Sequence, residues 1–172
     1  MIIDFHTHVF SPQIKKNRDK YIDQDPCFAI IYANPKAKLA TADELIASMD
    51  EEGVDMAVIA NYGWTTHELC VETNDYILES IARYPRRLIG LASVQPNSCD
   101  AALAEIERCV KGGIRGIGEM RPDLQHFDFR DEEVMVPLAE AITSLKSLEY
   151  THEAALNTAA RVLKPSLLDF LR

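Results

Sequence analysis

The chain has 172 residues, of which 47% are hydrophobic and 26% charged, and its net charge is −9. This length and composition predict one globular domain with a sizeable core. The negative charge argues against a nucleic-acid or anionic-membrane surface, and no apolar run is long enough to span a membrane. The N-terminus also lacks the basic and apolar regions of a secretory signal.

The cysteines are scattered, and none belongs to a C-x-x-C pair, which argues against a zinc knuckle or a redox motif. Unpaired cysteines in an acidic chain are typical of a reducing cytosol. We therefore expect a cytoplasmic protein with structural thiols at Cys27, Cys70, Cys99 and Cys109.

The first predicted element is an apolar strand over 2–8 that ends in two histidines one residue apart. Alternate side chains of a strand share a face, so His6 and His8 point the same way, with Asp4 below them. They are roughly 6–7 Å apart along the strand, and imidazole is a ligand of zinc, copper, iron and nickel. Two solvent-facing histidines are the alternative. The end of the first strand of an α/β chain favours the metal site.

A long polar loop is expected from Ser11 to about Ala40, because Pro12, Pro26 and Pro35 interrupt it. A loop of this length is usually functional or mobile. It either covers the site at the end of the first strand or packs on the surface.

The remaining chain alternates helices and strands. A capping box at Thr41 and Glu44 begins a helix that ends at Gly53. Later helices are expected to begin at Thr65 or Thr66, at Ser98 or Asp100, and at Asp131. The predicted strands cover 54–61, 88–95 and 114–121. This alternation predicts a parallel sheet with right-handed crossovers.

The last predicted strand ends in residues that suit a metal site. Ile117, Glu119 and Arg121 are expected to share a face, and Glu119 is placed to bind the same ion as the two histidines. A salt-bridged pair of Glu119 and Arg121 is the alternative. Gly116 and Gly118 on the other face would let a helix approach closely.

Other polar residues follow the predicted strands. Asn61 and Gln95 end strands, where they either bind a substrate or cap the chain. His67 and His126 lie on the same rim and are candidates for substrate binding, together with Arg121; surface positions are the alternative. Tyr62 and Trp64 are expected to cover the core, and His152 to be structural.

Three stretches together resemble the metal-dependent amidohydrolase superfamily: IIDFHTHVF at 2–10, NDYILESIARYPRRLIGLASVQP at 74–96 and GIRGIGEMRP at 113–122. The chain is similar to the amidohydrolase-related branch that includes aminocarboxymuconate-semialdehyde decarboxylase-like enzymes. The Gly118-Glu119 pair is also similar to TatD-type hydrolases. The resemblance implies a (β/α)8 TIM barrel with a mononuclear or binuclear centre, commonly zinc, at its C-terminal rim. It implies His6 and His8 as metal ligands and, less specifically, Glu119.

The chain also departs from that pattern. The family has further histidine ligands on strands five and six and an aspartate on strand eight, and nothing over 143–172 matches these strands. AALNTAARVL at 154–163 resembles the helix after strand eight. We therefore expect an α/β fold in one domain over 1–172: a partial barrel of about four βα units over 1–142 and a helical segment over 143–172.

The resemblance implies metal-dependent hydrolysis of a C–N or C–O bond in a small molecule by a metal-activated water, impaired by the missing ligands. One alternative is non-oxidative decarboxylation of a small unsaturated or aromatic acid. Another is a non-catalytic half-barrel that binds or oligomerises, since its open sheet edges predict a homo-oligomer. A nucleotide-binding flavodoxin-like sheet is disfavoured, because no glycine-rich loop follows the first strand.

Overall fold

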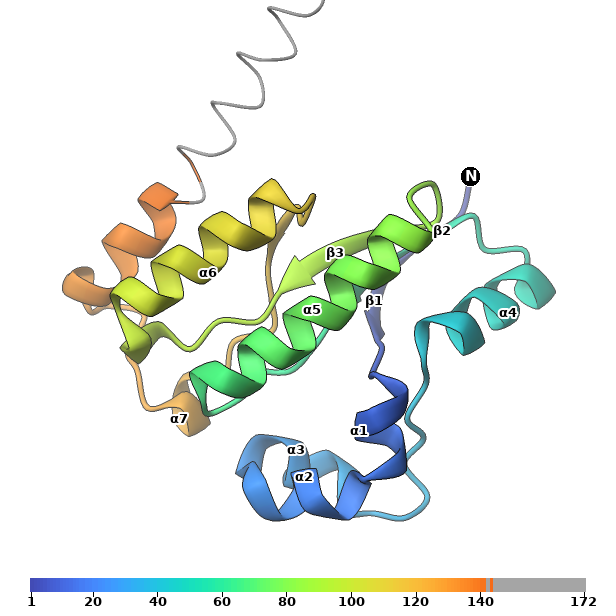
Figure 1. Cartoon of the computed structure of the whole chain (residues 1–172), viewed down its shortest axis with the longest axis horizontal. Coiled ribbons are helices and arrows are strands. Elements are labelled where there is room, and N and C mark those ends of the chain that lie inside the picture. The colour runs from blue at the N-terminus through green and yellow to red at the C-terminus, as the bar shows by residue number, and fades with distance from the viewer. Residues whose placement is uncertain (142, 144–172) are drawn as a thin grey trace, which may run out of the picture.

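The computed structural model describes residues 1–141 and 143. Four parallel strands form one sheet in the order β1-β2-β3-β4 (Figure 1). Successive strands alternate with helices, so the predicted α/β architecture of a partial TIM barrel is confirmed. The strands are β1 (Ile3–His8), β2 (Met56–Ala60), β3 (Leu88–Ala92) and β4 (Gly116–Ile117).

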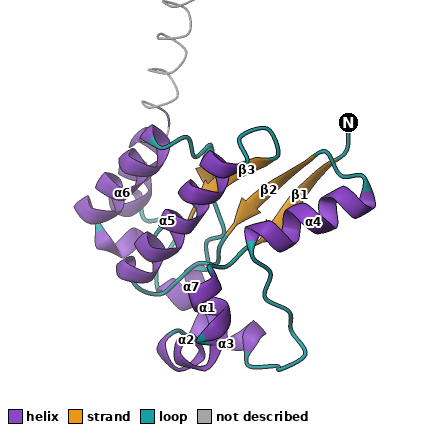
Figure 2. Ribbon diagram, turned by 45° about the vertical axis from the view of Figure 1, so that its right-hand side comes forward, coloured by secondary structure: helices purple, strands orange, loops and turns teal. Residues whose placement is uncertain are grey.

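Three longer helices cover one face of the sheet (Figures 1 and 2). They are α4 (Ala42–Glu52), α5 (His67–Arg83) and α6 (Asp100–Lys111). Their apolar side chains meet those of the strands in a buried cluster that includes Ile59 and Ile77. A Cβ at Gly90 of β3 would lie 2.7 Å from the Ile77 side chain, so glycine permits α5 to approach the sheet.

The predicted limits of α4 are confirmed by its contacts. The Thr41 side chain accepts a hydrogen bond from the Glu44 backbone, and the Glu44 carboxylate accepts one from the Thr41 backbone. Gly53 ends the helix with a left-handed φ of 70°. Thr66 caps α5, so the second of the two predicted starting residues is correct.

The prediction of a loop between Ser11 and Ala40 is wrong, because this insertion contains three short helices. They are α1 (Pro12–Lys16), α2 (Arg18–Gln24) and α3 (Pro26–Tyr32). Pro12 and Pro26 occupy the first helical position, which tolerates proline because its missing N–H has no helical partner there. Figure 2 shows the insertion at the same end of the sheet as α7 (Pro122–Gln125), a helix that the sequence did not predict.

Two other boundaries differ from the prediction. Helix α6 begins after Cys99, whose side chain makes no cap hydrogen bond, so neither Ser98 nor Asp100 caps it. Strand β4 contains only two residues where the sequence predicted eight. The helix predicted after Asp131 is present over 132–141, and the Asp131 carboxylate accepts a hydrogen bond from the Glu133 backbone.

The predictions for the segment after 143 lie outside the described residues. Within the part of the chain that the structure describes, no helix combines the length and the apolar character needed to cross a bilayer.

Candidate metal centre

Three side chains with metal-binding atoms converge at the carboxyl end of the sheet. The Nε2 atoms of His6 and His8 are 2.9 Å apart. The carboxylate oxygens of Glu119 lie 3.6 Å from His6 Nε2 and 3.7 Å from His8 Nε2. One donor atom from each residue therefore lies within 4.8 Å of the others. The structure brings together the three residues that the sequence singled out as metal ligands.

The strand ends explain why these residues meet. His6 and His8 lie in the last three residues of β1, and His8 is level with Ala60 of β2 in the parallel register. After β4, the backbone N–H of Glu119 donates to the carbonyl of Asn61, which directly follows β2. Backbone pairing between the ends of separate strands thus carries the carboxylate to the histidines.

The face predicted for Glu119 rested on strand alternation, and this part of the prediction is wrong. Strand β4 ends at Ile117, so alternation does not extend to Glu119 and Arg121. Ile117 packs in an apolar cluster with residues of α6, whereas Glu119 reaches the histidines. The two glycines also differ from expectation, because a Cβ at Gly116 or Gly118 would meet Leu91 of the neighbouring strand and not a helix.

The donor set fits a divalent metal ion. Atoms bound to one ion at about 2.0–2.2 Å lie roughly 3 Å or slightly more from one another, as these three do. Burial lowers the pKa of His8 and outweighs the opposing effect of the Glu119 charge, which favours a neutral ring with a free lone pair. Two facing Nε2 atoms need a proton or a cation between them, and the neighbouring carboxylate favours the cation.

Asn61 and Arg121 border the cluster in different ways. The Asn61 side chain is 1% exposed, and neither of its polar atoms has a hydrogen-bond partner among the described residues. Arg121 forms a two-pronged ion pair with Asp123, with distances of 3.0 and 2.8 Å, which together with the charge of Glu119 raises the pKa of the guanidinium. Asn61 therefore offers unused polar atoms, whereas the Arg121 fork is already occupied.

The remaining candidates do not belong to the group of three donors. His67 is the first residue of α5 and is partly exposed. His126 is exposed, and its carbonyl accepts a hydrogen bond from Asn97. Gln95 caps a short 3-10 helix, η1 (Pro96–Ser98), and donates to Thr65, which agrees with the capping alternative. The metal-ligand cluster includes none of them.

One neighbour of the cluster was not recognised from the sequence. The ring of Tyr62 stacks on His8, with a centroid distance of 4.6 Å and an angle of 16° between the planes. Both Tyr62 and Trp64 are buried, as expected of residues that cover the core. The only signal for the stacking was the position of Tyr62 two residues after β2.

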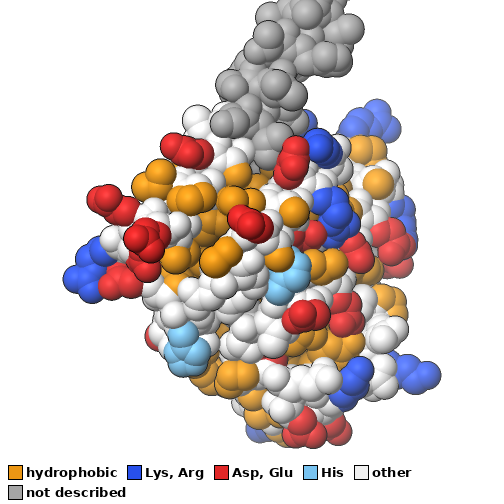
Figure 3. All heavy atoms as spheres, turned by 60° about the vertical axis from the view of Figure 1, so that its left-hand side comes forward, with side chains coloured by type: hydrophobic (Ala, Val, Ile, Leu, Met, Phe, Trp, Pro, Cys, Tyr) orange, Lys and Arg blue, Asp and Glu red, His pale blue; other side chains and the backbone are white. Residues whose placement is uncertain are grey.

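Figure 3 shows one face of the molecule, on which histidine side chains lie near acidic ones. Side-chain exposure in the cluster runs from 65% for His6 to 41% for Glu119 and 16% for His8. The candidate centre is therefore open to solvent on the His6 side and closed behind His8.

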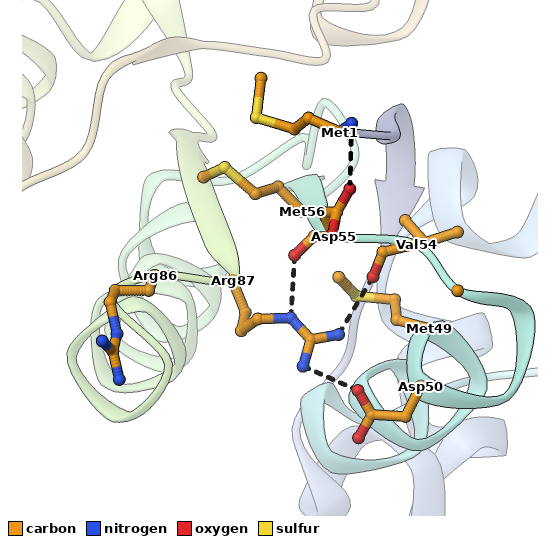
Figure 4. Close-up of a pocket in the computed structure, with 9 residues that line it drawn as sticks. Met1, Met49, Asp50, Val54, Asp55, Met56, Arg86 and Arg87 are labelled. Carbon is orange, nitrogen blue, oxygen red and sulfur yellow. Dashed lines mark hydrogen bonds and ion pairs between the residues drawn. The ribbon is translucent and has the colours of Figure 1, made fainter.

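A separate cavity of about 690 Å³ lies at the amino ends of the strands (Figure 4). Several of its polar groups bind one another. Arg87 donates to the carbonyls of Asp55 and Val54 and pairs with Asp50, while the N-terminus lies 3.6 Å from the Asp55 carboxylate. These contacts tie β2 to the start of β1 and β3, and the cavity takes no part in the candidate centre.

The fold and the site define an α/β protein with a partial barrel and a cluster of histidine and carboxylate donors at the carboxyl ends of its strands. The family model described as Amidohydrolase matches residues 3–153, and the chain belongs to that family. This confirms the family resemblance seen in the sequence.

Solved structures with the same fold include proteins that are named as decarboxylases. A 5-carboxyvanillate decarboxylase from Novosphingobium aromaticivorans, complexed with manganese and 4-hydroxy-3-methoxy-5-nitrobenzoic acid, has a TM-score of 0.69 at 21% identity, covering 85% of this chain and 48% of that one. A 2,6-dihydroxybenzoate decarboxylase from Rhizobium has a TM-score of 0.56 at 16% identity, covering 84% and 47%.

A third solved structure with this fold is named as a hydrolase. It is that of a probable 2-pyrone-4,6-dicarboxylic acid hydrolase from Acinetobacter baumannii with citric acid bound, with a TM-score of 0.54 at 23% identity. The match covers 84% of this chain and 46% of the hydrolase. The chain thus spans about half the length of each of these three proteins.

Proposed function

We propose that this chain supplies the first wall of an amidohydrolase-type metal centre, in which His6, His8 and Glu119 hold one divalent cation. The convergence of their donor atoms within 4.8 Å carries the proposal. A divalent metal bound there would lower the pKa of a coordinated water and polarise a substrate carbonyl. Catalytic zinc sites often use three protein ligands and leave a position open.

Zinc is the proposed metal, and manganese is the second candidate. Two imidazoles favour zinc, whereas a carboxylate also suits manganese. The Novosphingobium decarboxylase supports the second candidate, because its structure was determined with manganese. A competition experiment, in which Zn²⁺ and Mn²⁺ are offered together to the full chain, measures which ion the three donors bind more tightly.

The proposed substrate is a small carboxylic acid. Two reactions are proposed for it, decarboxylation and hydrolysis. Decarboxylation is favoured by the fold match to the 5-carboxyvanillate enzyme, which has the highest TM-score of the three structures described. Hydrolysis is supported by the match to the pyrone-dicarboxylic acid hydrolase. For binding the acid, we propose Arg121, whose fork would exchange Asp123 for the substrate, with Asn61, His67 and His126 as further contacts.

Metal content tests the proposal directly. The full chain is loaded with Zn²⁺ or Mn²⁺, dialysed and analysed for bound metal. The wild type is expected to retain one equivalent, and the double variant His6→Ala/His8→Ala to lose it. His126→Ala is the matched control, because this histidine is exposed and outside the cluster. Equal metal content in the wild type and the double variant would refute the proposed metal site at His6 and His8.

The reaction is tested with two sets of small molecules. An aromatic carboxylic acid reports decarboxylation through release of carbon dioxide, and a cyclic ester reports hydrolysis through release of a proton. Turnover of one set that depends on the added metal identifies the reaction. A metal-loaded chain that turns over neither set favours the non-catalytic alternative.

We also propose that the chain associates with itself through the edges of its sheet. Among the described residues, β1 pairs only with β2, and β4 only with β3. Unpaired strand edges promote pairing with another chain.

A further inference from the structure

The side of His8 away from the open face is closed by aromatic rings. Tyr62 stacks on His8, and Phe10 lies behind Tyr62 with a centroid distance of 6.3 Å and an angle of 12° between the planes. Phe10 and Tyr62 are 1% and 7% exposed. The three rings therefore form a nearly parallel stack, with His8 at its exposed end.

The helical insertion braces this stack from the side. Tyr32 of α3 meets Tyr62 edge-on, with centroids 5.7 Å apart, and meets Phe10 edge-on at 5.1 Å. Phe28 of the same helix packs against Tyr32 at 4.7 Å. Edge-to-face and offset contacts at these distances are favourable arrangements of aromatic rings.

In the part of the chain that the structure describes, no hydrogen bond of normal geometry fixes the His8 ring at Nδ1. A histidine that binds a metal usually donates its second ring N–H to a carbonyl or carboxylate, which fixes the ring. The Nδ1 atom of His8 is buried and has no hydrogen-bond partner of normal geometry among the described residues. A contact with the Ala60 backbone raises the pKa of this ring, so a weak backbone interaction is present, but no described side chain holds the ring by a hydrogen bond at Nδ1.

We propose that Tyr62, held by Phe10 and by Tyr32 of the insertion, is the positioning residue that aims His8 Nε2 at His6 and Glu119. The stack adds to the weak contact with the Ala60 backbone and gives the ring the support that a carbonyl or carboxylate of normal hydrogen-bond geometry usually provides. It also gives the insertion between β1 and α4 a role, because α3 supports a metal ligand. The effect on metal affinity rests on the proposed function, whereas the orientation of the ring does not.

The first test compares metal affinity in variants of the full chain by competition with a chromophoric chelator. Tyr62→Phe keeps the ring and is expected to bind Zn²⁺ within about twofold of the wild type. Tyr62→Leu keeps an apolar side chain without a flat ring and is expected to bind about tenfold more weakly, as loss of an outer-shell partner does.

Tyr21→Leu is the matched control. Tyr21 belongs to the same apolar cluster and contacts Phe28 and Trp64, but neither His8 nor Tyr62. It is expected to lower stability and leave metal affinity unchanged. Equal affinities in wild type and Tyr62→Leu, or equal losses in Tyr62→Leu and Tyr21→Leu, would overturn the positioning role.

The second test needs no metal. In the metal-free wild type, the ring current of Tyr62 is expected to shift the NMR signals of the His8 ring protons upfield, and Tyr62→Leu to return them downfield. Unshifted His8 signals in the wild type would overturn the inference even if Tyr62→Leu does not fold. A wild type that shows the shift but binds no metal would refute the proposed function and leave the orientation of His8 intact.

Discussion

At the scale of single residues, one buried amide joins α5, α6 and the end of β3. Asn74 of α5 donates to the Ser93 carbonyl at 2.9 Å and to Glu105 of α6 at 2.8 Å, and it accepts from the Ser93 backbone at 2.8 Å. Arg108 completes the network with two hydrogen bonds of 2.7 Å to the Glu105 carboxylate. This network fixes the chain where it leaves β3, and the Ser93 hydroxyl in turn donates to the Tyr62 carbonyl at 2.8 Å.

Replacing Glu105 by Gln is expected to destabilise the fold by about 1–3 kcal/mol. Its amide oxygen can take the place of Oε1, which accepts from Asn74 and Arg108 Nη2, but its NH2 group would face Arg108 Nε where Oε2 now accepts. Burial alone would raise the pKa of Glu105, but the hydrogen bonds from Arg108, Asn74 and Cys109 outweigh it, and the pKa is lowered. The charge therefore stabilises the fold above the unfolded pKa of about 4.3, and this contribution disappears as the pH falls through the folded pKa.

Urea denaturation at pH 7 and near pH 3.5 measures the difference between wild type and Glu105→Gln. We expect a clear difference at neutral pH that shrinks in acid. Glu107→Gln is the control, since Glu107 is 54% exposed in its pair with Lys111. A difference that is the same at both pH values would contradict the assigned role of the charge.

At the scale of elements, one buried carboxylate ties the insertion to the rest of the fold. The Asp25 side chain is 0% exposed and caps α3 by accepting from the Phe28 backbone at 2.9 Å. Its other oxygen accepts from the backbone and the hydroxyl of Thr65 at 2.8 and 2.7 Å. The start of α3 is thereby held against the loop between β2 and α5, which contains Tyr62.

Asp25→Ala leaves these donors without their acceptor, and we expect it to cost about 2–4 kcal/mol of stability. Asp25→Asn keeps one acceptor oxygen and should cost less. Urea denaturation, with near-ultraviolet circular dichroism of the aromatic cluster as a second signal, measures both. Asp23→Ala, which removes an exposed carboxylate of α2, is the control. Equal effects of Asp25→Ala and Asp23→Ala would show that Asp25 does not hold the insertion.

The elements that the sequence predicted well are those with local signals. Helix α4 carries its start and its end within 13 residues, in the capping box at Thr41 and in Gly53. The insertion has start signals as well, since Ser11 and Asp25 cap helices that begin with proline. These helices are short, however, and depend on burying Tyr21 and Phe28 against Trp64, far along the chain. Proline and short polar runs therefore suggested a loop where tertiary contacts form helices.

In the candidate site, too, residues close together in the sequence were predicted for the right reason, whereas those brought together by the fold were not. His6 and His8 are two residues apart on one strand, so their convergence could be predicted from strand geometry. Glu119 was chosen correctly as a neighbour of the histidines, but for a reason that fails, because β4 ends two residues before it. Tyr62 was assigned only to the core, since the stacking on His8 depends on how two strand ends meet.

At the scale of the whole molecule, β1 exposes apolar side chains at the edge of the sheet. Phe5 is 74% exposed, and Ile2 just before the strand is 58% exposed. The chain spans 48% of the length of the Novosphingobium decarboxylase with the same fold. Among the described residues, β1 has a strand neighbour on one side alone. We propose that burial of this apolar edge drives the self-association.

Phe5→Lys is expected to weaken this association, because burying a phenylalanine contributes about 1.5–3 kcal/mol and a lysine at an edge opposes pairing. The corresponding loss is roughly tenfold or more in the dissociation constant. Sedimentation velocity of the metal-free chain over a range of concentrations measures it. Ile30→Lys is the matched control, since Ile30 is an apolar residue, 61% exposed, on α3 and not on the sheet. A wild type that sediments as a monomer at every concentration would exclude the edge as an interface, and equal weakening by the two lysines would point to a nonspecific effect of charge.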